Sequence, residues 1–531
     1  MDQGQPLLVF TAQRILAMDG TEPEALAVHG EQIVGSGSSA EMEARFPRAE
    51  WIDLEGAVVV PGFNDAHCHP SQAALARVRV DLTAVSGPDA VREALLERLL
   101  ASRPGDWIVA QALDERRVGA GVVDRSFLDR VSRDHPIVVV HYSLHRAVAN
   151  TRALERMGYR EAGDAPPGGE LLTDGSGALN GWLIERAWLD PWLPGLDREA
   201  VLPTGQIEAQ VAALEEVNQE LHALGITSYC DAIVTPVEQR MYASALAQGR
   251  LSPRVSMLLW HTYFDETSAF PPGERHRLQT AGVKMMLDGA LSGGTCLCQT
   301  PYPSATGKDN GLQILSDDEF VATVRRVHAA GRRVAVHANG DRAIGKVLDA
   351  FASLPPSQDG HPVGHRIEHC SIVDDELIQR MRVLEVIPVP FGAFVHFHGE
   401  EILAYYGNEQ QNSICAHRSL LDGGLAVAGS SDYPLVPADP LTAVQSMVTR
   451  RTEDGRVLGP EQRIPVEAAL QVYTSGSAHA TGEADVKGRL SPGQLADFVV
   501  LDRDITRIDP QDIGTTAVRS TWVGGRCVWR S

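Results

Sequence analysis

The sequence predicts an α/β protein: a (β/α)8 TIM-like barrel with a small β-sandwich domain made from both chain ends and a large insertion after barrel strand 1. Through the central part of the chain, apolar β-branched runs alternate with long helical stretches, which indicates a parallel sheet. Short strand patterns separated by turn signals occupy both ends. The 531 residues suffice for about three domains or for one large barrel with additions.

The charge balance is acidic, with 47 Lys and Arg against 69 Asp and Glu and a net charge of −22. This balance argues against nucleic acid or an anionic membrane as the main partner. No stretch is long and apolar enough to span a bilayer, and the first residues lack the pattern of a signal peptide. We therefore expect a cytoplasmic protein with free cysteines and a small-molecule substrate and, because homo-oligomers are common, a homodimer.

The strand patterns at the two chain ends are expected to pair, because chain ends usually lie close together. Residues 1–57 plus 480–531 are therefore predicted to form the composite β-sandwich domain, and residues 58–479 the barrel domain. The eight predicted barrel strands are 58–67, 225–230, 254–259, 283–287, 333–337, 365–369, 385–389 and 425–429.

Residues 70–224 do not follow the rhythm of the barrel. They are far longer than one crossover and have strand patterns of their own at 107–112 and 136–142. The segment leaves the barrel directly after its first strand, so we expect an insertion that covers the face where an active site would lie.

The first predicted barrel strand ends in two histidines, His67 and His69, one residue apart. Residues i and i+2 of a strand point the same way, so both imidazoles would lie on one side, as metal ligands do. Two histidines in a solvated loop explain this spacing equally well when it is considered alone.

Four later strands carry, end at or are followed by a polar residue that an apolar strand does not favour. These residues are Lys284, His337, His369 and Asp432. Each one alone could be an ordinary paired or solvated side chain. Because catalytic groups of a barrel come from the C-terminal ends of several strands, the four residues and the two histidines are predicted to converge on one mouth.

Several motifs together resemble one family. They are His67-Cys68-His69 after 61–66, and the stretches 337–343, 366–369 and 429–434, supported by 282–291 and 493–502. This set resembles the amidohydrolase superfamily, and within it the branch of N-substituted formamide deformylases and YtcJ-like hydrolases. The resemblance extends over nearly the whole chain.

The resemblance implies that one or two divalent cations, zinc above all, are held by His67, His69, Lys284, His337, His369 and Asp432. Lys284 matches a position that carbon dioxide can carboxylate in related enzymes. A carbamate is an anionic oxygen ligand that could bridge two metals, whereas an ammonium group has no lone pair. A free Lys284 amine beside a single metal is the alternative to this bridged pair.

The implied reaction is hydrolysis of a C–N bond in a small organic amide, formamide, carbamate or cyclic amide by a hydroxide that the cation generates. Asp432 is the candidate to accept the proton of the water and pass it to the departing nitrogen. His145 matches a family position from which a histidine reaches the substrate, although a structural hydrogen bond is an equal alternative. The competing functions are a deaminase or esterase on the same site and a catalytically silent metal-binding scaffold.

Two further features bear on the site. Glu368 would point to the opposite side of its strand from His369, so it is expected to support the site rather than bind a metal. The family commonly continues with Gly-Ser-Arg-Thr where this chain has Ser292-Gly293-Gly294-Thr295. If that arginine touches substrate, the substrate of this chain differs.

Overall fold

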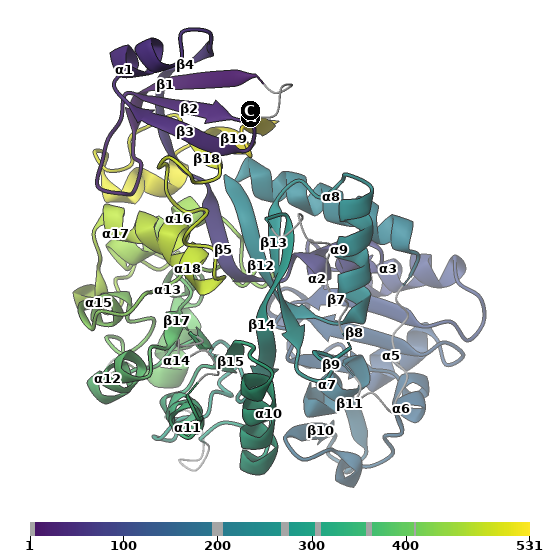
Figure 1. The fold of residues 1–531 in the computed structure, drawn as a ribbon. Coiled ribbons are helices and arrows are strands. Elements are labelled where there is room, and N and C mark those ends of the chain that lie inside the picture. The colour runs from purple at the N-terminus through teal and green to yellow at the C-terminus, as the bar shows by residue number, and fades with distance from the viewer. Residues whose placement is uncertain (1–5, 194–204, 267–275, 303–309, 357–363, 408–409) are drawn as a thin grey trace.

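The computed structural model describes residues 6–193, 205–266, 276–302, 310–356, 364–407 and 410–531, and its strands form three sheets (Figure 1). The middle sheet is parallel and carries the candidate ligands. A second sheet combines strands from both chain ends, and a third is built from the segment that follows the first strand of the middle sheet.

The middle sheet is a nearly closed barrel of seven parallel strands. Their order from one edge to the other is β5 (Phe63–Cys68), β12 (Ile226–Val234), β13 (Arg254–Trp260), β14 (Leu278–Met286), β15 (Val334–Ala338), β16 (Arg366–His369) and β17 (Ile387–Val389). Val283 of β14 is in register with Val334 of β15, and both are buried. Such β-branched side chains suit strands that are covered on both faces.

The eighth predicted strand, 425–429, is not a strand in the structure, so the (β/α)8 description is not confirmed. The segment still lies between the two edge strands of the barrel. Ala428 donates its N–H to the Pro388 carbonyl at 3.2 Å, and Gly429 accepts the N–H of Ala66 at 2.9 Å. Pro388 has no N–H to donate in return, which prevents a regular ladder at this seam.

The first predicted strand, 58–67, is two strands in the structure. β4 (Glu50–Pro61) pairs with strands from both chain ends, and β5 begins only at Phe63. Between them, a Cβ on Gly62 would lie 2.1 Å from the Thr227 hydroxyl, so the chain passes too close to β12 for any larger residue. The barrel therefore begins several residues later than predicted.

Amphipathic helices cover the outside of the barrel (Figure 1). In α11 (Asp341–Ala352), residues Ile344, Val347 and Phe351 are buried on one face. The other outer helices are α8 (Ile207–Ala223), α9 (Pro236–Ala247), α10 (Asp317–Ala329), α12 (Asp375–Val383), α15 (His417–Asp422) and α16 (Pro440–Thr449). Shorter helices α13 (Phe394–Phe397), α14 (Gly399–Tyr406), α17 (Val466–Gln471) and α18 (Ser477–Ala480) lie in the C-terminal third of the chain.

Strands from both chain ends join one seven-stranded sheet, and the predicted β-sandwich is not confirmed. Its order is β20 (Arg526–Arg530), β19 (Val518–Val523), β18 (Phe498–Leu501), β4, β1 (Leu7–Ile15), β2 (Ala25–His29) and β3 (Gln32–Gly37), with α1 (Ser39–Arg45) between β3 and β4. Phe10, Phe498 and Trp522 pack together, with the last two rings stacked at 5.4 Å between centroids. This aromatic contact joins the N-terminal and C-terminal strands.

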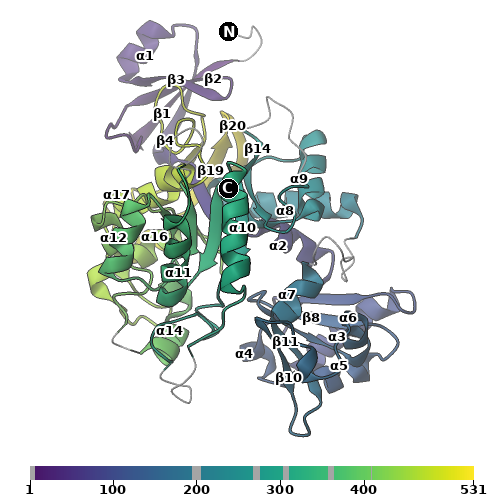
Figure 2. The same ribbon diagram turned by 60° about the horizontal axis from the view of Figure 1, so that its bottom comes forward.

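The segment after β5 forms a lobe beside the barrel (Figure 2). Its mixed sheet has the order β10 (Gly169–Thr173), β11 (Leu179–Glu185), β9 (Arg146–Ala149), β8 (Ile137–His141), β7 (Ile108–Leu113) and β6 (Val80–Asp81). The helices of this segment are α2 (Pro70–Arg77), α3 (Pro88–Leu100), α4 (Glu115–Val118), α5 (Arg125–Val131), α6 (Thr151–Met157) and α7 (Arg186–Trp192). β7 and β8 match the strands predicted at 107–112 and 136–142.

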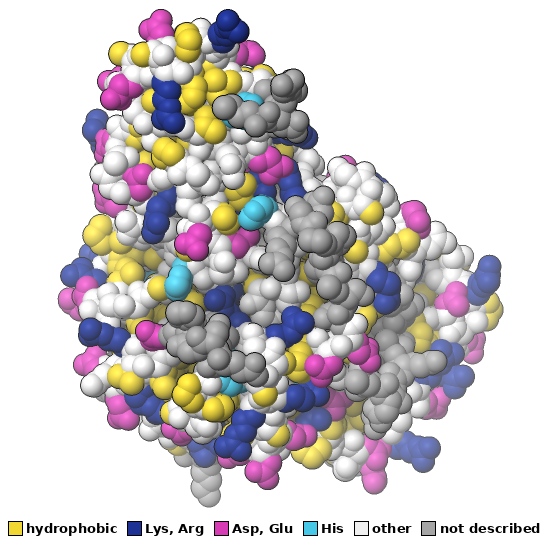
Figure 3. Space-filling model, viewed as in Figure 1, with side chains coloured by type: hydrophobic (Ala, Val, Ile, Leu, Met, Phe, Trp, Pro, Cys, Tyr) yellow, Lys and Arg dark blue, Asp and Glu magenta, His cyan; other side chains and the backbone are white. Residues whose placement is uncertain are grey.

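On the face shown in Figure 3, acidic and basic side chains are interspersed. All seven cysteines lie among the described residues and are free, as expected. Within the described ranges, no helix combines the length and the apolar character needed to cross a membrane.

Candidate metal centre

One buried cavity at the C-terminal ends of the barrel strands contains every predicted ligand. Its lining includes His67, His69, Lys284, His337, His369 and Asp432. His67 lies on β5, Lys284 on β14 and His337 on β15, while His369 is the last residue of β16. Because parallel strands end at the same rim of a barrel, residues far apart in the sequence meet there.

The tightest group consists of His67, His69 and Asp432, whose potential donor atoms all lie within 4.8 Å of one another. Asp432 Oδ1 is 3.2 Å from His69 Nε2 and 3.5 Å from His67 Nε2. Lys284 adjoins this group, with its Nζ 3.3 Å from His67 Nε2. The His-x-His pair is therefore buried beside a carboxylate and is not part of a solvated loop.

His337 and His369 form the adjoining wall of the cavity. Their ring centroids are 4.1 Å apart, and the His369 ring lies 5.2 Å from that of His67. His337 Nε2 is 3.1 Å from the carbonyl oxygen of Gly289, which can only accept a hydrogen bond, and 3.0 Å from the amide nitrogen of Asn339, which can donate one, so its two neighbours fit opposite tautomers. Nδ1 of His69 and Nδ1 of His369 are buried and have no hydrogen-bond partner among the described residues.

Burial sets the protonation of this cluster. It lowers the pKa of His67, His337 and His369 well below the usual value, so these imidazoles are neutral at neutral pH. It also lowers the pKa of Lys284 to about 8. Neutral imidazoles with free lone pairs, together with the Asp432 carboxylate, form the donor set that a divalent cation requires, so the residues present fit a metal.

Two of the candidate ligands have an unusual backbone conformation. His369 and Asp432 both have a φ of 68°, in the left-handed region that residues with a side chain rarely adopt. Residues held this way cluster at functional sites, because the surrounding structure must compensate for the strain. At both positions the left-handed conformation occurs where the chain leaves the barrel, and both side chains line the cavity.

Glu368 determines which nitrogen of His67 is available. Its Oε2 accepts a hydrogen bond from His67 Nδ1 at 2.5 Å, and Arg366 donates to both carboxylate oxygens at 2.6 and 2.8 Å. With the proton fixed on Nδ1, the lone pair of Nε2 points toward Lys284 and Asp432. The supporting role expected for Glu368 agrees with this geometry.

We expect Glu368→Gln to weaken zinc binding by about 10- to 100-fold, because a neutral amide polarises and orients His67 less well than a carboxylate. Titration of chelator-treated protein with zinc against a chromophoric competitor measures the affinity. Glu238→Gln, which alters another buried glutamate outside the cavity, is the matched control. Equal affinities for the two variants would contradict the role of Glu368.

His145 reaches the cavity from the insertion. It precedes β9, its ring centroid lies 5.2 Å from that of His337, and its Nδ1 is 2.8 Å from Oε2 of the buried Glu185. Burial alone would lower the pKa of His145, but the Glu185 carboxylate raises it above the usual value. His145 therefore lines the cavity and is held there by a structural hydrogen bond.

Several residues of the site were not foreseen. Asp65 accepts hydrogen bonds from the backbone N–H of His67 and of Ser431, both at 3.1 Å, and so ties two ligand segments together. Asp288 accepts backbone N–H groups at 2.9 Å from Asn339, Gly340 and Leu297. Leu189, Trp192 and Ile233 add apolar walls. The sequence pointed to Asp65 only through its position beside a ligand motif. It gave no sign that Leu189, Trp192 and Ile233 would line the cavity.

Comparison with known proteins identifies relatives over the full length. The YtcJ protein of Bacillus subtilis (strain 168) is 29% identical over 527 residues, covering 96% of this chain and 97% of that protein. The N-substituted formamide deformylase of Arthrobacter pascens is 28% identical over 558 residues, covering 99% of this chain and 98% of that protein. Both belong to the branch that the motifs indicated, so the resemblance is confirmed.

A solved structure shares the fold. The match with a metal-dependent hydrolase of uncharacterised function from Pyrococcus horikoshii OT3 covers 95% of this chain and 99% of that chain. The TM-score is 0.74 and the sequence identity is 24%. The model of the amidohydrolase family matches residues 50–529. Because this match extends over most of the chain and includes every residue of the candidate centre, the protein belongs to the amidohydrolase family and is a hydrolase that acts on carbon–nitrogen bonds.

Proposed function

We propose that this chain uses a divalent metal to hydrolyse the C–N bond of a small organic amide, such as a formamide, a carbamate or a cyclic amide. One observation carries the proposal: six potential ligands and His145 line a single buried cavity at the rim of the barrel. The relative from Arthrobacter pascens is named as a deformylase of N-substituted formamides, which supports an amide as the substrate.

Zinc is the metal that we propose for the site. Imidazole nitrogens and carboxylate oxygens are its common ligands, and a catalytic zinc site combines such side chains with an open position. When bound, a divalent cation lowers the pKa of a water molecule and polarises the carbonyl group that is attacked.

Three residues orient a ligand, transfer the proton and bind the substrate. Glu368 keeps the proton of His67 on Nδ1, so that Nε2 can donate its lone pair. Asp432, whose Oδ1 lies at the centre of the compact group, accepts the proton of the attacking water and delivers it to the departing nitrogen. His145, whose ring lies 5.2 Å from that of His337, lines the cavity from the insertion and is the candidate to donate a hydrogen bond to the substrate.

We further propose that carbon dioxide carboxylates the amine of Lys284, with loss of a proton, and that the resulting carbamate would offer oxygen ligands to two metal ions. Its Nζ is buried beside His67, where a metal-free ammonium group would face imidazole nitrogens rather than a paired carboxylate. Because burial lowers the pKa of Lys284 to about 8, part of the amine is neutral at neutral pH. Only the neutral amine can attack carbon dioxide. The carbamate would supply the anionic oxygens that a second metal requires.

Labelling with ¹³C-bicarbonate tests this modification. We expect a carbamate carbon signal in the NMR spectrum of the metal-loaded wild type and no such signal in Lys284→Met. The wild type should bind about two metal ions per chain, and Lys284→Met should bind fewer. Lys346→Met, which alters a lysine on the outer helix α11, should keep the signal. A wild-type spectrum without the signal would indicate a free amine beside a single metal.

Metal analysis followed by activity assays tests the function as a whole. We expect stoichiometric zinc, hydrolysis of small amides, and loss of that activity on chelation with recovery after zinc is restored. Bound metal without chelator-sensitive turnover of any substrate would indicate a silent scaffold. Faster turnover of esters, or of amino groups on aromatic rings, would favour an esterase or a deaminase.

A further inference from the structure

One buried carboxylate beside the metal cavity has no part in the proposed reaction. Glu185 is the last residue of strand β11 in the insertion, directly before helix α7, and it is 1% exposed. Among the described residues, its carboxylate has two hydrogen-bond partners. Nδ1 of His145 lies 2.8 Å from Oε2, and the Thr295 hydroxyl lies 3.5 Å from Oε1. A buried carboxylate destabilises a protein unless it is paired, so these two contacts indicate a specific role.

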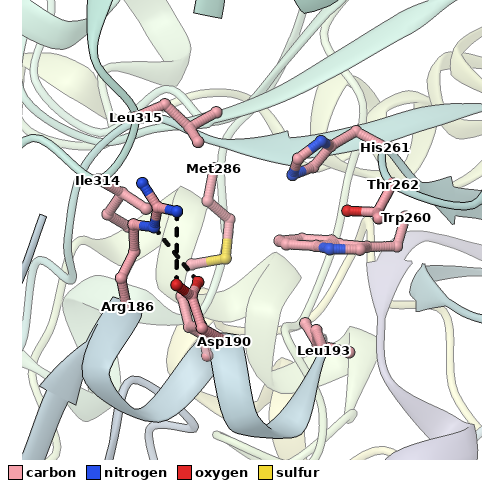
Figure 4. Close-up of a pocket in the computed structure, with 10 residues that line it drawn as sticks. Arg186, Asp190, Leu193, Trp260, His261, Thr262, Met286, Ile314 and Leu315 are labelled. Atoms are coloured by element: carbon pink, nitrogen blue, oxygen red, sulfur yellow. Dashed lines mark hydrogen bonds and ion pairs between the residues drawn. The ribbon is translucent and has the colours of Figure 1, made fainter. Parts of the chain in front are cut away.

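The adjacent cation does not pair with Glu185. Arg186, the next residue, directs its guanidinium group to Asp190, one turn further along α7 (Figure 4). Its Nε lies 3.2 Å from Asp190 Oδ1, and its Nη1 lies 3.6 Å from Glu319 Oε2. Within the described parts of the chain, His145 is therefore the one basic side chain that contacts the Glu185 carboxylate.

Glu185 holds His145 by its backbone as well as by its side chain. The Glu185 N–H donates to the His145 carbonyl at 2.8 Å, in addition to the contact between Oε2 and Nδ1. Trp188, in the first turn of α7, donates its indole N–H to the Leu144 carbonyl at 3.0 Å. The corner between β11 and α7 thus fastens two successive residues, Leu144 and His145, and determines where the imidazole lies.

The backbone around His145 is strained. Glu185 has a φ of 48° and a ψ of −121°, and Leu144 has a φ of 62°. Both φ values lie in the left-handed region that residues with a side chain rarely adopt. Such conformations persist only where surrounding contacts enforce them, and they cluster at functional sites. One strained residue precedes His145 and the other binds its ring, so the strain is concentrated at the support of a single side chain of the cavity.

The contact with Glu185 decides which nitrogen of His145 is available. An ionised carboxylate only accepts hydrogen bonds, so Nδ1 of His145 carries a proton. Nε2 is then the ring nitrogen that remains for a bound molecule. The ring lines the metal cavity, with its centroid 5.2 Å from that of His337.

Thr295 supports the carboxylate from the side of the barrel. It belongs to the loop that follows β14, and its hydroxyl oxygen accepts the Ala290 N–H at 2.9 Å while the hydroxyl faces Glu185 Oε1. A Cβ on Gly289 would lie 2.2 Å from this hydroxyl oxygen, so only glycine lets the loop pass so close. Contacts therefore run from His145 through Glu185 and Thr295 to the loop after β14.

We propose that Glu185 is a positioning residue: its carboxylate fixes the ring of His145 so that Nε2 meets the amide group of the substrate, and Thr295 fixes the carboxylate. The effect of Glu185 on the rate rests on the proposed function, whereas the state of the ring does not. The alternative is a structural anchor that only fastens the corner between β11 and α7. An anchor would matter equally with or without the His145 ring, so removing that ring separates the two roles.

A double-mutant cycle on an N-substituted formamide measures the connection between the two residues. We expect Glu185→Met to lower kcat by about 10²-fold with little change in KM, as for a misplaced group at the reacting centre. In the His145→Ala background the same substitution should cause no further loss, because the ring that Glu185 positions is gone. Equal losses in the two backgrounds would identify a structural anchor and overturn the proposal.

Two further variants complete the kinetic test. Glu185→Gln keeps an oxygen that can accept the hydrogen bond of Nδ1, so its kcat should lie between those of the wild type and Glu185→Met. If Glu185→Met does not fold, the cycle is measured with Glu185→Gln. Glu238→Met makes the same change at a buried glutamate outside the metal cavity and should keep the wild-type kcat. An equal loss in Glu238→Met would contradict the proposal.

Nitrogen NMR of histidine-labelled protein separates this inference from the proposed function, because it needs no turnover. The signals of His145 are those that vanish in His145→Ala. At about pH 8 we expect Nδ1 of His145 to carry a proton in the wild type and to lose it in Glu185→Met, where no carboxylate accepts it. If no amide is hydrolysed but this difference is found, the proposed function fails and the positioning role stands. If amides are hydrolysed but the Nδ1 signal is the same in both proteins, the positioning role fails alone.

Discussion

Replacing Asp432 by asparagine is expected to lower kcat about 10²- to 10⁴-fold, the usual contribution of a general acid or base. The side chain is buried, and its Oδ1 lies 3.2 Å from His69 Nε2 and 3.5 Å from His67 Nε2. An amide of nearly the same shape fills this space but cannot accept the proton that the proposed reaction removes from water. Steady-state kinetics on an amide substrate at saturating zinc measures the loss.

Asp439→Asn is the matched control for this prediction. Asp439 lies seven residues further along the chain and caps α16, where its carboxylate accepts the Leu441 N–H at 3.0 Å. Asparagine is also a good N-cap residue, so activity and fold should both be retained. If Asp432→Asn turned over substrate at nearly the wild-type rate with its metal in place, Asp432 would not be the proton carrier.

Replacing Arg254 by methionine is expected to lower the free energy of unfolding by about 3–5 kcal/mol, the usual cost of leaving a buried charge without its partner. Arg254, on β13, donates to Asp497 at 2.6 and 3.0 Å and to Glu31 at 3.1 Å. Its side chain is only 1% exposed. This network fastens the sheet of the chain ends to the barrel, and denaturant unfolding measures its contribution.

The cost of Arg254→Met should depend on pH with a definite sign. Burial raises the pKa of Asp497, but the Arg254 charge outweighs this effect and holds the pKa below its usual value. The pair therefore stabilises the native state above about pH 4, and its contribution is lost as the pH falls through the lowered native pKa. The difference between wild type and variant should shrink accordingly in acid.

Arg277→Met is the control for the network. Arg277 pairs with Glu31 at 2.6 Å, but its side chain is 20% exposed, so solvent screens this pair. We expect a loss below about 1 kcal/mol, as for other exposed ion pairs. Equal losses for Arg254→Met and Arg277→Met would show that burial does not govern this network.

Local pattern predicted much of this molecule. The alternation of β-branched runs and helical stretches indicated a parallel barrel, and polar residues at strand ends indicated which side chains meet. Both errors in the predicted strands have causes that lie in pairing with distant segments. The run 58–67 begins with apolar β-branched residues and was predicted as one strand, and only pairing with the chain ends divides it at Gly62 into strands of two different sheets. At 425–429 the pattern favours a strand, but Pro388 on the neighbouring strand lacks the backbone N–H that a regular ladder of hydrogen bonds requires.

The sequence by itself determined the parallel order of the central strands and the six potential ligands, because both depend on residue type and spacing along the chain. The tertiary structure alone decided which nitrogen of His67 is free, through Glu368, and how Asp65 joins the segments of His67 and Ser431. It alone also brought Leu189 and Trp192 of helix α7 to the wall of the metal cavity. These features depend on contacts between residues tens to hundreds of positions apart, and spacing along the chain carries no information about such distances.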